Sequence, residues 1–106
     1  MIGEGPAGMV YYHPGRLMDG IIDPRWPEAL IYEPAKPGRN RRPTLVGVEL
    51  AMPYSLWERE KPPRFLGVRF QPEDEFGVFG IHVWVWRRNP KGLLAESNPR
   101  VSCGAA

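Results

Sequence analysis

The sequence predicts a mainly β domain: a small curved antiparallel sheet, barrel or sandwich of four to five strands, with at most one or two short helices. Residues 29–33, 44–52, 65–70 and 76–86 are rich in β-branched and aromatic side chains. The chain also contains 12 Gly and 13 Pro among 106 residues. Because both residue types interrupt helices, no long helix is expected. A chain of this length fits one domain with one core.

The clearest element pair is a hairpin. Residues 29–33 and 44–52 are joined by a loop that contains Pro37 and Gly38, which predicts two antiparallel strands. In the second strand Val46, Val48 and Leu50 alternate, so we expect all three to face the core. Glu49 then lies on the opposite face among small residues. We divide the single domain 1–106 into a turn-rich wrap (1–28), a β core (29–88) and a loop-rich tail (89–106).

The remaining elements are short. Met9–Tyr12 has the composition of a short strand within the wrap. Ser55 and Glu58 have capping-box spacing, so one helix of two turns at most is expected near them. Phe65–Phe70 is expected as one strand. The run 76–86 is the longest strand-like segment, with His82, Trp84 and Trp86 on one face.

Composition argues against several classes of function. The net charge of +2 is small and argues against nucleic acid as a partner. No apolar run is long enough to cross a bilayer, so no membrane partner is expected. Cys103 is the single cysteine, so no intramolecular disulfide can form. Without a phosphate loop or a dinucleotide fingerprint, no nucleotide or dinucleotide cofactor is expected.

The N-terminus bears on the compartment. The first residues contain neither a charged n-region nor an apolar h-region, which predicts a cytoplasmic protein. An exported form is the alternative if a leader has been removed from the N-terminus.

His82 and Glu49 are the candidate catalytic residues. His82 lies between aromatic residues on its strand face, where it either packs and hydrogen-bonds or transfers protons. Glu49 on a central strand needs a partner if it is buried. That partner is His82, which makes an acid–base pair, or Arg69, which makes a structural ion pair.

The ligand-binding and metal-binding candidates extend this set. Trp84, Trp86, Tyr12 and Arg69 are the candidate ligand-binding residues, with the two tryptophans either lining a pocket or packing in the core. A divalent metal is a further alternative, held by His13, His82 and Glu49 as a facial triad.

Four segments resemble a family of small bacterial hypothetical proteins that are often exported. The C-terminal pattern is HxWxWxxNPxG followed by NPxVSC, and the matching segments are Asp23–Pro34, Leu45–Glu49, His82–Leu93 and Asn98–Cys103. The family has no settled function, so the resemblance implies kinship without an activity. A family histidine falls at the position of Tyr12 here, and Glu49 and His82 are the candidate polar residues that this chain retains.

Three functions remain open on the sequence. The first is a small β domain that binds a compact ligand in a pocket lined by aromatic residues and His82. The second is an enzyme without an organic cofactor, such as a lyase, isomerase or cyclase, that uses His82 and Glu49 for proton transfer. The third is a structural or protein-interaction module that forms a homodimer.

Overall fold

The fold is that of a computed structural model, which describes residues 2–3, 9–35, 42–95 and 98–101. Its main feature is an open antiparallel sheet with strand order β1-β2-β3-β4-β8-β7, and a small second sheet pairs β5 with β6. The mainly β prediction is confirmed, and the open edges at β1 and β7 favour the curved sheet over a closed barrel. The strands are β1 (Ile2–Gly3), β2 (Met9–Tyr12), β3 (Ala29–Glu33), β4 (Thr44–Pro53), β5 (Arg64–Phe65), β6 (Val68–Arg69), β7 (Gln71–Glu73) and β8 (Val78–Val83).

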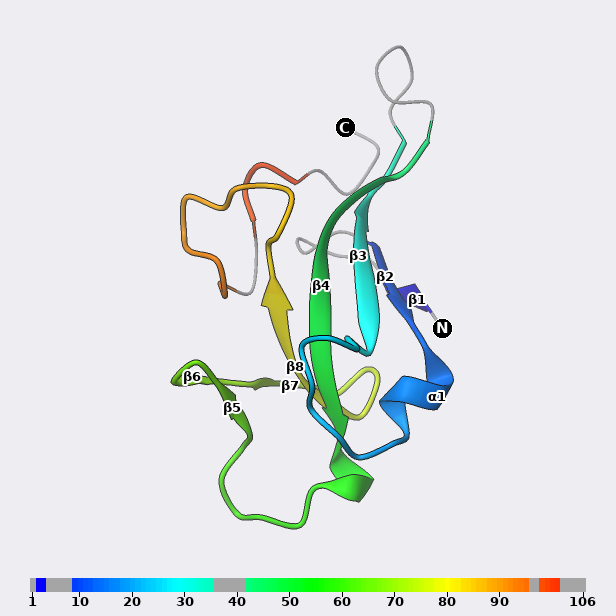
Figure 1. Cartoon of the computed structure of the whole chain (residues 1–106), viewed down its shortest axis with the longest axis vertical. Coiled ribbons are helices and arrows are strands. Elements are labelled where there is room, and N and C mark those ends of the chain that lie inside the picture. Colours follow the sequence, from blue (N-terminus) through cyan, green and yellow to red (C-terminus); the bar gives the residue numbers. More distant parts are fainter. Residues whose placement is uncertain (1, 4–8, 36–41, 96–97, 102–106) are drawn as a thin grey trace.

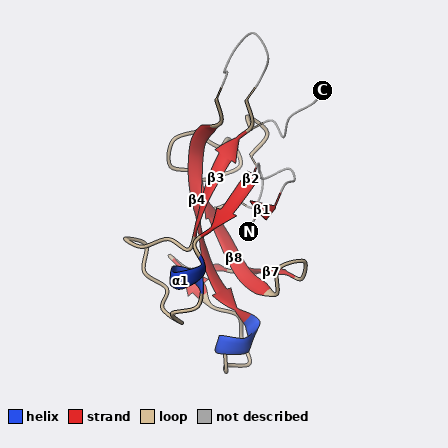
Figure 2. Ribbon diagram, turned by 90° about the vertical axis from the view of Figure 1, so that its right-hand side faces the viewer, coloured by secondary structure: helices blue, strands red, loops and turns tan. Residues whose placement is uncertain are grey.

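The long strand β4 is the centre of the sheet. Figure 1 shows β3, β2 and β1 on one side of it and β8 on the other, with the β5–β6 hairpin set apart near the lower end. Turned by 90°, the strands follow a strongly twisted path (Figure 2), as expected for paired extended chains of L-residues. The predicted hairpin of residues 29–33 and 44–52 is confirmed as β3 and β4.

A bulge in β4 changes which of its side chains share a face of the sheet. Ile31 pairs with Gly47 and Tyr32 pairs with Leu45, so Val46 is left as the extra residue. Val46 therefore packs with Ile31, Ala51 and Trp84 on one face of the sheet, whereas Leu50 packs with Phe70 and Ile81 on the other. The prediction that Val46 and Leu50 share one face is wrong, because the bulge shifts the alternation by one residue.

The predicted strand Phe65–Phe70 is interrupted by a tight turn. Leu66 and Gly67 both have positive φ, 51° and 79°, which suits the two central residues of a hairpin turn between β5 and β6. Leu66 is consequently 73% exposed while Phe70 is fully buried. These residues do not line one face of a single strand, because a non-glycine residue adopts the left-handed conformation at the turn.

The helices are short. A four-residue helix, α1 (Pro14–Leu17), follows β2, and a 3-10 turn, η1 (Tyr54–Leu56), lies within the segment where a short helix was expected. Pro14 occupies the start of α1, where proline is favoured, and His13 Nδ1 accepts a hydrogen bond from the Arg16 amide at 3.1 Å. Among the described residues, no helix is long and apolar enough to cross a membrane.

Candidate functional site

Strand pairing brings Glu49 and His82 together. Glu49 of β4 lies directly opposite His82 of β8 in the antiparallel ladder, and residues in such a pair project from the same face of the sheet. The distance between His82 Nε2 and Glu49 Oε1 is 2.6 Å. Both residues are buried, at 6% and 0% exposure. Of the two partners that the sequence allowed for Glu49, the structure therefore has His82.

Glu73 is the third member of this cluster. Its strand, β7, pairs with β8, and Glu73 Oε2 lies 3.5 Å from His82 Nε2. The hydroxyl of Tyr12 donates a hydrogen bond to Glu73 Oε1 at 3.0 Å. Side chains from four strands of the sheet thus meet at one place, and we call Glu49, Glu73 and His82 the acidic–histidine cluster.

Gly80 makes room for the two carboxylates. A Cβ atom at this position would lie 2.5 Å from Glu73 Oε2 and 3.1 Å from Glu49 Cδ, which is closer than ordinary contact. The sequence predicts small neighbours for Glu49 on its own strand, where Gly47 and Ala51 flank it. The space lies instead over the glycine of the neighbouring strand, because Gly80 pairs with Ala51, two residues along from Glu49.

The electrostatics of the cluster follow from its burial. Removal from water raises the pKa of Glu49 to about 7, although its hydrogen bond to His82 acts in the opposite direction. Glu73 is only partly buried. Burial raises its pKa, but the contacts with His82 outweigh that effect and hold the pKa below the usual value. Burial together with the neighbouring carboxylates raises the pKa of Tyr12, so Tyr12 stays a hydrogen-bond donor.

One oxygen in the cluster has no partner. Glu49 Oε2 is buried and makes no hydrogen bond. A buried polar atom without a partner costs free energy, so this oxygen marks a place where a proton or a cation would be stabilised.

A pocket of about 240 Å³ adjoins the cluster. It lies before the first residue of β7, Gln71, where β8 continues past Gly80 to Ile81 and His82. Residues of β6 and of the segment near residue 94 complete its wall. His82, Glu73 and Arg69 contribute its ionisable groups. The complete lining is Val68, Arg69, Gln71, Glu73, Gly80, Ile81, His82, Leu94 and Ala95.

The two tryptophans lie outside this lining. Trp84 is 2% exposed, its Nε1 donates to the Ala95 carbonyl oxygen at 2.6 Å, and its ring meets the His82 ring edge-on with centroids 6.0 Å apart. Trp86 is 57% exposed. It lies beyond the end of β8 at Val83, although its amide still donates a hydrogen bond to the Val46 carbonyl oxygen of β4 at 3.1 Å. Neither tryptophan therefore lines the pocket beside His82. Trp84 instead packs in the core with its ring against that of His82.

Some of the other predicted site residues lie at the pocket or the cluster, and others do not. Arg69 lines the pocket, and Tyr12 contacts the cluster through Glu73 without lining the pocket. His13 is exposed and caps α1. The third potential metal ligand beside Glu49 and His82 is Glu73 rather than His13. Cys103 lies outside the described residues.

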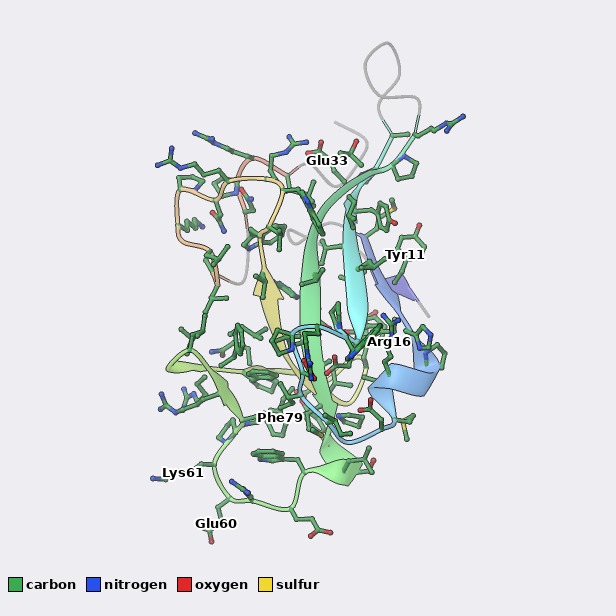
Figure 3. The ribbon with its side chains drawn as sticks, in the orientation of Figure 1. Tyr11, Arg16, Glu33, Glu60, Lys61 and Phe79 are labelled. Carbon is green, nitrogen blue, oxygen red and sulfur yellow. The ribbon has the colours of Figure 1, made fainter. Side chains whose placement is uncertain are left out.

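Three acidic residues that the sequence did not single out are buried or half-buried: Glu73, Glu28 and Glu33. Glu73 lies in an acidic stretch that looks like a solvated turn, and only its pairing with β8 places it beside His82. Glu33 continues the alternation of Ala29 and Ile31, which is a signal for the core face, and its Oε1 lies 3.2 Å from Arg87 Nη2. Figure 3 shows Glu33 at one end of the molecule, far from the exposed Glu60 and Lys61 at the other.

The side chain of Glu28 bonds the backbone of β4 just before β3 begins. β3 begins one residue later, and Glu28 Oε1 accepts a hydrogen bond from the Ala51 amide of β4 at 3.3 Å. The side chain is buried and its Oε2 has no partner. Burial raises the pKa of Glu28 to about 7, so the folded protein binds this proton more tightly than the unfolded chain does.

We expect Glu28→Gln to remove part of the pH dependence of stability. Because the pKa of the buried acid rises from 4.5 to about 7 on folding, its contribution to stability is present below the lower value. That contribution is lost as the pH rises toward the upper value. Wild type should lose about 3 kcal/mol relative to Glu28→Gln across this interval. Urea unfolding at several pH values measures the difference. Glu75→Gln, which alters an exposed carboxylate, is the control, and equal slopes for all three proteins would contradict the prediction.

Comparisons with known proteins found no matching family model, no similar curated protein and no similar solved structure. The resemblance to the family of bacterial hypothetical proteins stays a prediction.

Proposed function

We propose that the chain is a small-molecule-binding β domain whose ligand occupies the pocket beside His82. One observation carries this proposal: an almost fully buried histidine, held at 2.6 Å by Glu49, contributes to the wall of a pocket. Positioned polar groups within an otherwise apolar wall are typical of ligand sites. Val68, Ile81 and Leu94 supply the apolar part of that wall, and Arg69 and Glu73 supply charges of both signs.

The size and charge of the pocket limit the ligand. A volume of about 240 Å³ is slightly below the range of about 300–1,000 Å³ typical of drug-sized ligands. We therefore expect a compact molecule with an apolar part against Leu94 and Ile81 and a polar group directed at His82.

A fragment screen by NMR tests this proposal. We expect hits that shift the imidazole resonances of His82, and we expect Val68→Trp to abolish them by filling the pocket from β6. Val85→Trp is the matched control, because Val85 is also exposed, at 51%, but does not line the pocket. The absence of any hit near His82, or equal binding to both variants, would argue against the proposal.

The contact between Glu49 and His82 favours proton-transfer catalysis as a second candidate function. A proton can pass across the 2.6 Å between the two groups when their proton affinities are similar. A lyase or isomerase of this kind would exchange an acidic C–H of a bound fragment with D₂O. The same NMR spectra measure that exchange and separate catalysis from binding alone.

A further inference from the structure

The acidic–histidine cluster brings three potential metal ligands into one small volume. One ligand atom from each of Glu49, Glu73 and His82 lies within 4.8 Å of the others. The three residues come from β4, β7 and β8, which are neighbours in the sheet. Because ladder hydrogen bonds hold all three strands in register, the backbone beneath the cluster is rigid.

In the part of the chain that the structure describes, no lysine or arginine neutralises the two carboxylates of the cluster. Among the described residues, the ion-pair partner of both Glu49 and Glu73 is His82, and no lysine or arginine pairs with either of them. Two carboxylates beside one imidazole carry a net negative charge when the histidine is neutral. Charges buried in this way are usually paired or bound to a metal.

The unpartnered oxygen of Glu49 is an independent sign of a missing ligand. Glu49 is fully buried and its Oε2 makes no hydrogen bond. The carboxyl groups of Glu49 and Glu73 both face the space where Gly80 has no side chain. A cation near this space would neutralise both carboxylates and occupy the free oxygen.

The surroundings suit a metal ion with open coordination positions. Tyr12 donates its hydroxyl hydrogen to Glu73 Oε1 at 3.0 Å, which is the type of contact that orients a metal ligand. Glu73, Gly80 and His82 also line the pocket, so water or a ligand can reach the ion from that side. Donor atoms about 2.1 Å from an ion and at a right angle are about 3 Å apart. His82 Nε2 and Glu49 Oε1, now at 2.6 Å, need to separate only slightly.

We propose that Glu49, Glu73 and His82 bind one divalent first-row transition ion, with Zn²⁺ as the reference case. An imidazole combined with carboxylates suits Zn²⁺, Fe²⁺ and Mn²⁺, whereas sites for Ca²⁺ use oxygen ligands. The remaining coordination positions face the pocket and hold water. This site differs from the triad expected from sequence, because Glu73 takes the place of His13. The inference goes beyond the proposed function, because binding of the ion requires no organic ligand.

Calorimetric titration of the tag-free chain with Zn²⁺ tests the site. A Cys103→Ser background removes the single thiol. We expect one ion per chain, and a Co²⁺ absorption spectrum that is typical of few protein ligands plus water. Removing a side chain that orients a metal ligand typically weakens metal binding about 10- to 100-fold. Removing a ligand itself should weaken metal binding by at least as much. Glu73→Gln should therefore weaken binding at least about 10-fold.

Three variants complete the experiment. Glu75→Gln removes a nearby exposed carboxylate and His13→Gln removes the other histidine, and both should leave Zn²⁺ affinity unchanged. Gly80→Ala keeps every ligand but displaces the Glu73 carboxylate, so it should weaken binding as Glu73→Gln does. Failure to bind Zn²⁺, or equal affinity of Glu73→Gln and Glu75→Gln, overturns the inference. Val68→Trp separates the two proposals, because it should block fragments and still bind Zn²⁺.

Discussion

Replacing His82 with leucine is expected to lower the free energy of unfolding by about 3 kcal/mol at neutral pH. Glu49 is fully buried, its Oε1 lies 2.6 Å from His82 Nε2 and its Oε2 has no partner. Leucine cannot hydrogen-bond, so the variant leaves a buried carboxyl group with the like-charged Glu73 beside it. Urea unfolding at neutral pH measures the loss.

A double-mutant cycle identifies the origin of this loss. Glu49→Gln in the His82→Leu background removes the buried acid, so most of the lost stability should return if the unpaired carboxyl group is the cause. If the double variant is as unstable as His82→Leu, the imidazole contributes through packing against Trp84 instead. The cycle therefore measures the coupling between His82, which lines the pocket, and Glu49, which holds it.

Gly47→Ala is expected to cost about 3 kcal/mol of stability. A Cβ atom at Gly47 would lie 2.5 Å from the carbonyl oxygen of Val83. That oxygen belongs to the backbone of the neighbouring strand, so it cannot move aside as a flexible side chain would. Either β8 separates from β4 at this point or the two strands shift their register.

Gly15→Ala is the matched control for this prediction. Its added Cβ would meet only the side chain of His13, at 3.3 Å, and alanine is favoured over glycine within a helix such as α1. We expect the control to be neutral or slightly stabilising. Similar unfolding free energies for Gly47→Ala and Gly15→Ala would show that the sheet at Val83 adapts without cost.

The sequence predicted the fold class and the hairpin because both depend on local signals. Alternating apolar residues in 29–33 and 44–52, together with a Pro-Gly loop, are sufficient to indicate two antiparallel strands. Which side chains share a face of the sheet was predictable only as far as the alternation of apolar residues continued. At Val46 a bulge interrupts it, and at Leu66 a positive φ does so. Neither residue type signals such a backbone in the sequence.

The candidate site was partly predictable for a different reason. Glu49 and His82 are conspicuous as polar residues within apolar strands, which is a property of the sequence. Glu73 is not conspicuous, because it lies among other polar residues in an acidic stretch. Trp86 was assigned to the face of His82 by continuing the strand to residue 86, but β8 ends at Val83. Beyond Val83 the chain is held by separate hydrogen bonds, such as those from Trp84 Nε1 to the Ala95 carbonyl oxygen and from the Trp86 amide to the Val46 carbonyl oxygen.

By itself the sequence determined that this protein is a mainly β domain and that Glu49 and His82 are its most unusual polar residues. Alternation and turn residues act over a few positions, so they can be read without the tertiary structure. Only the tertiary structure decided that Glu49 pairs with His82, that Glu73 joins them over Gly80, and that a pocket opens beside them. These outcomes depend on the register between β4, β7 and β8, and register is set by the packing of the whole sheet.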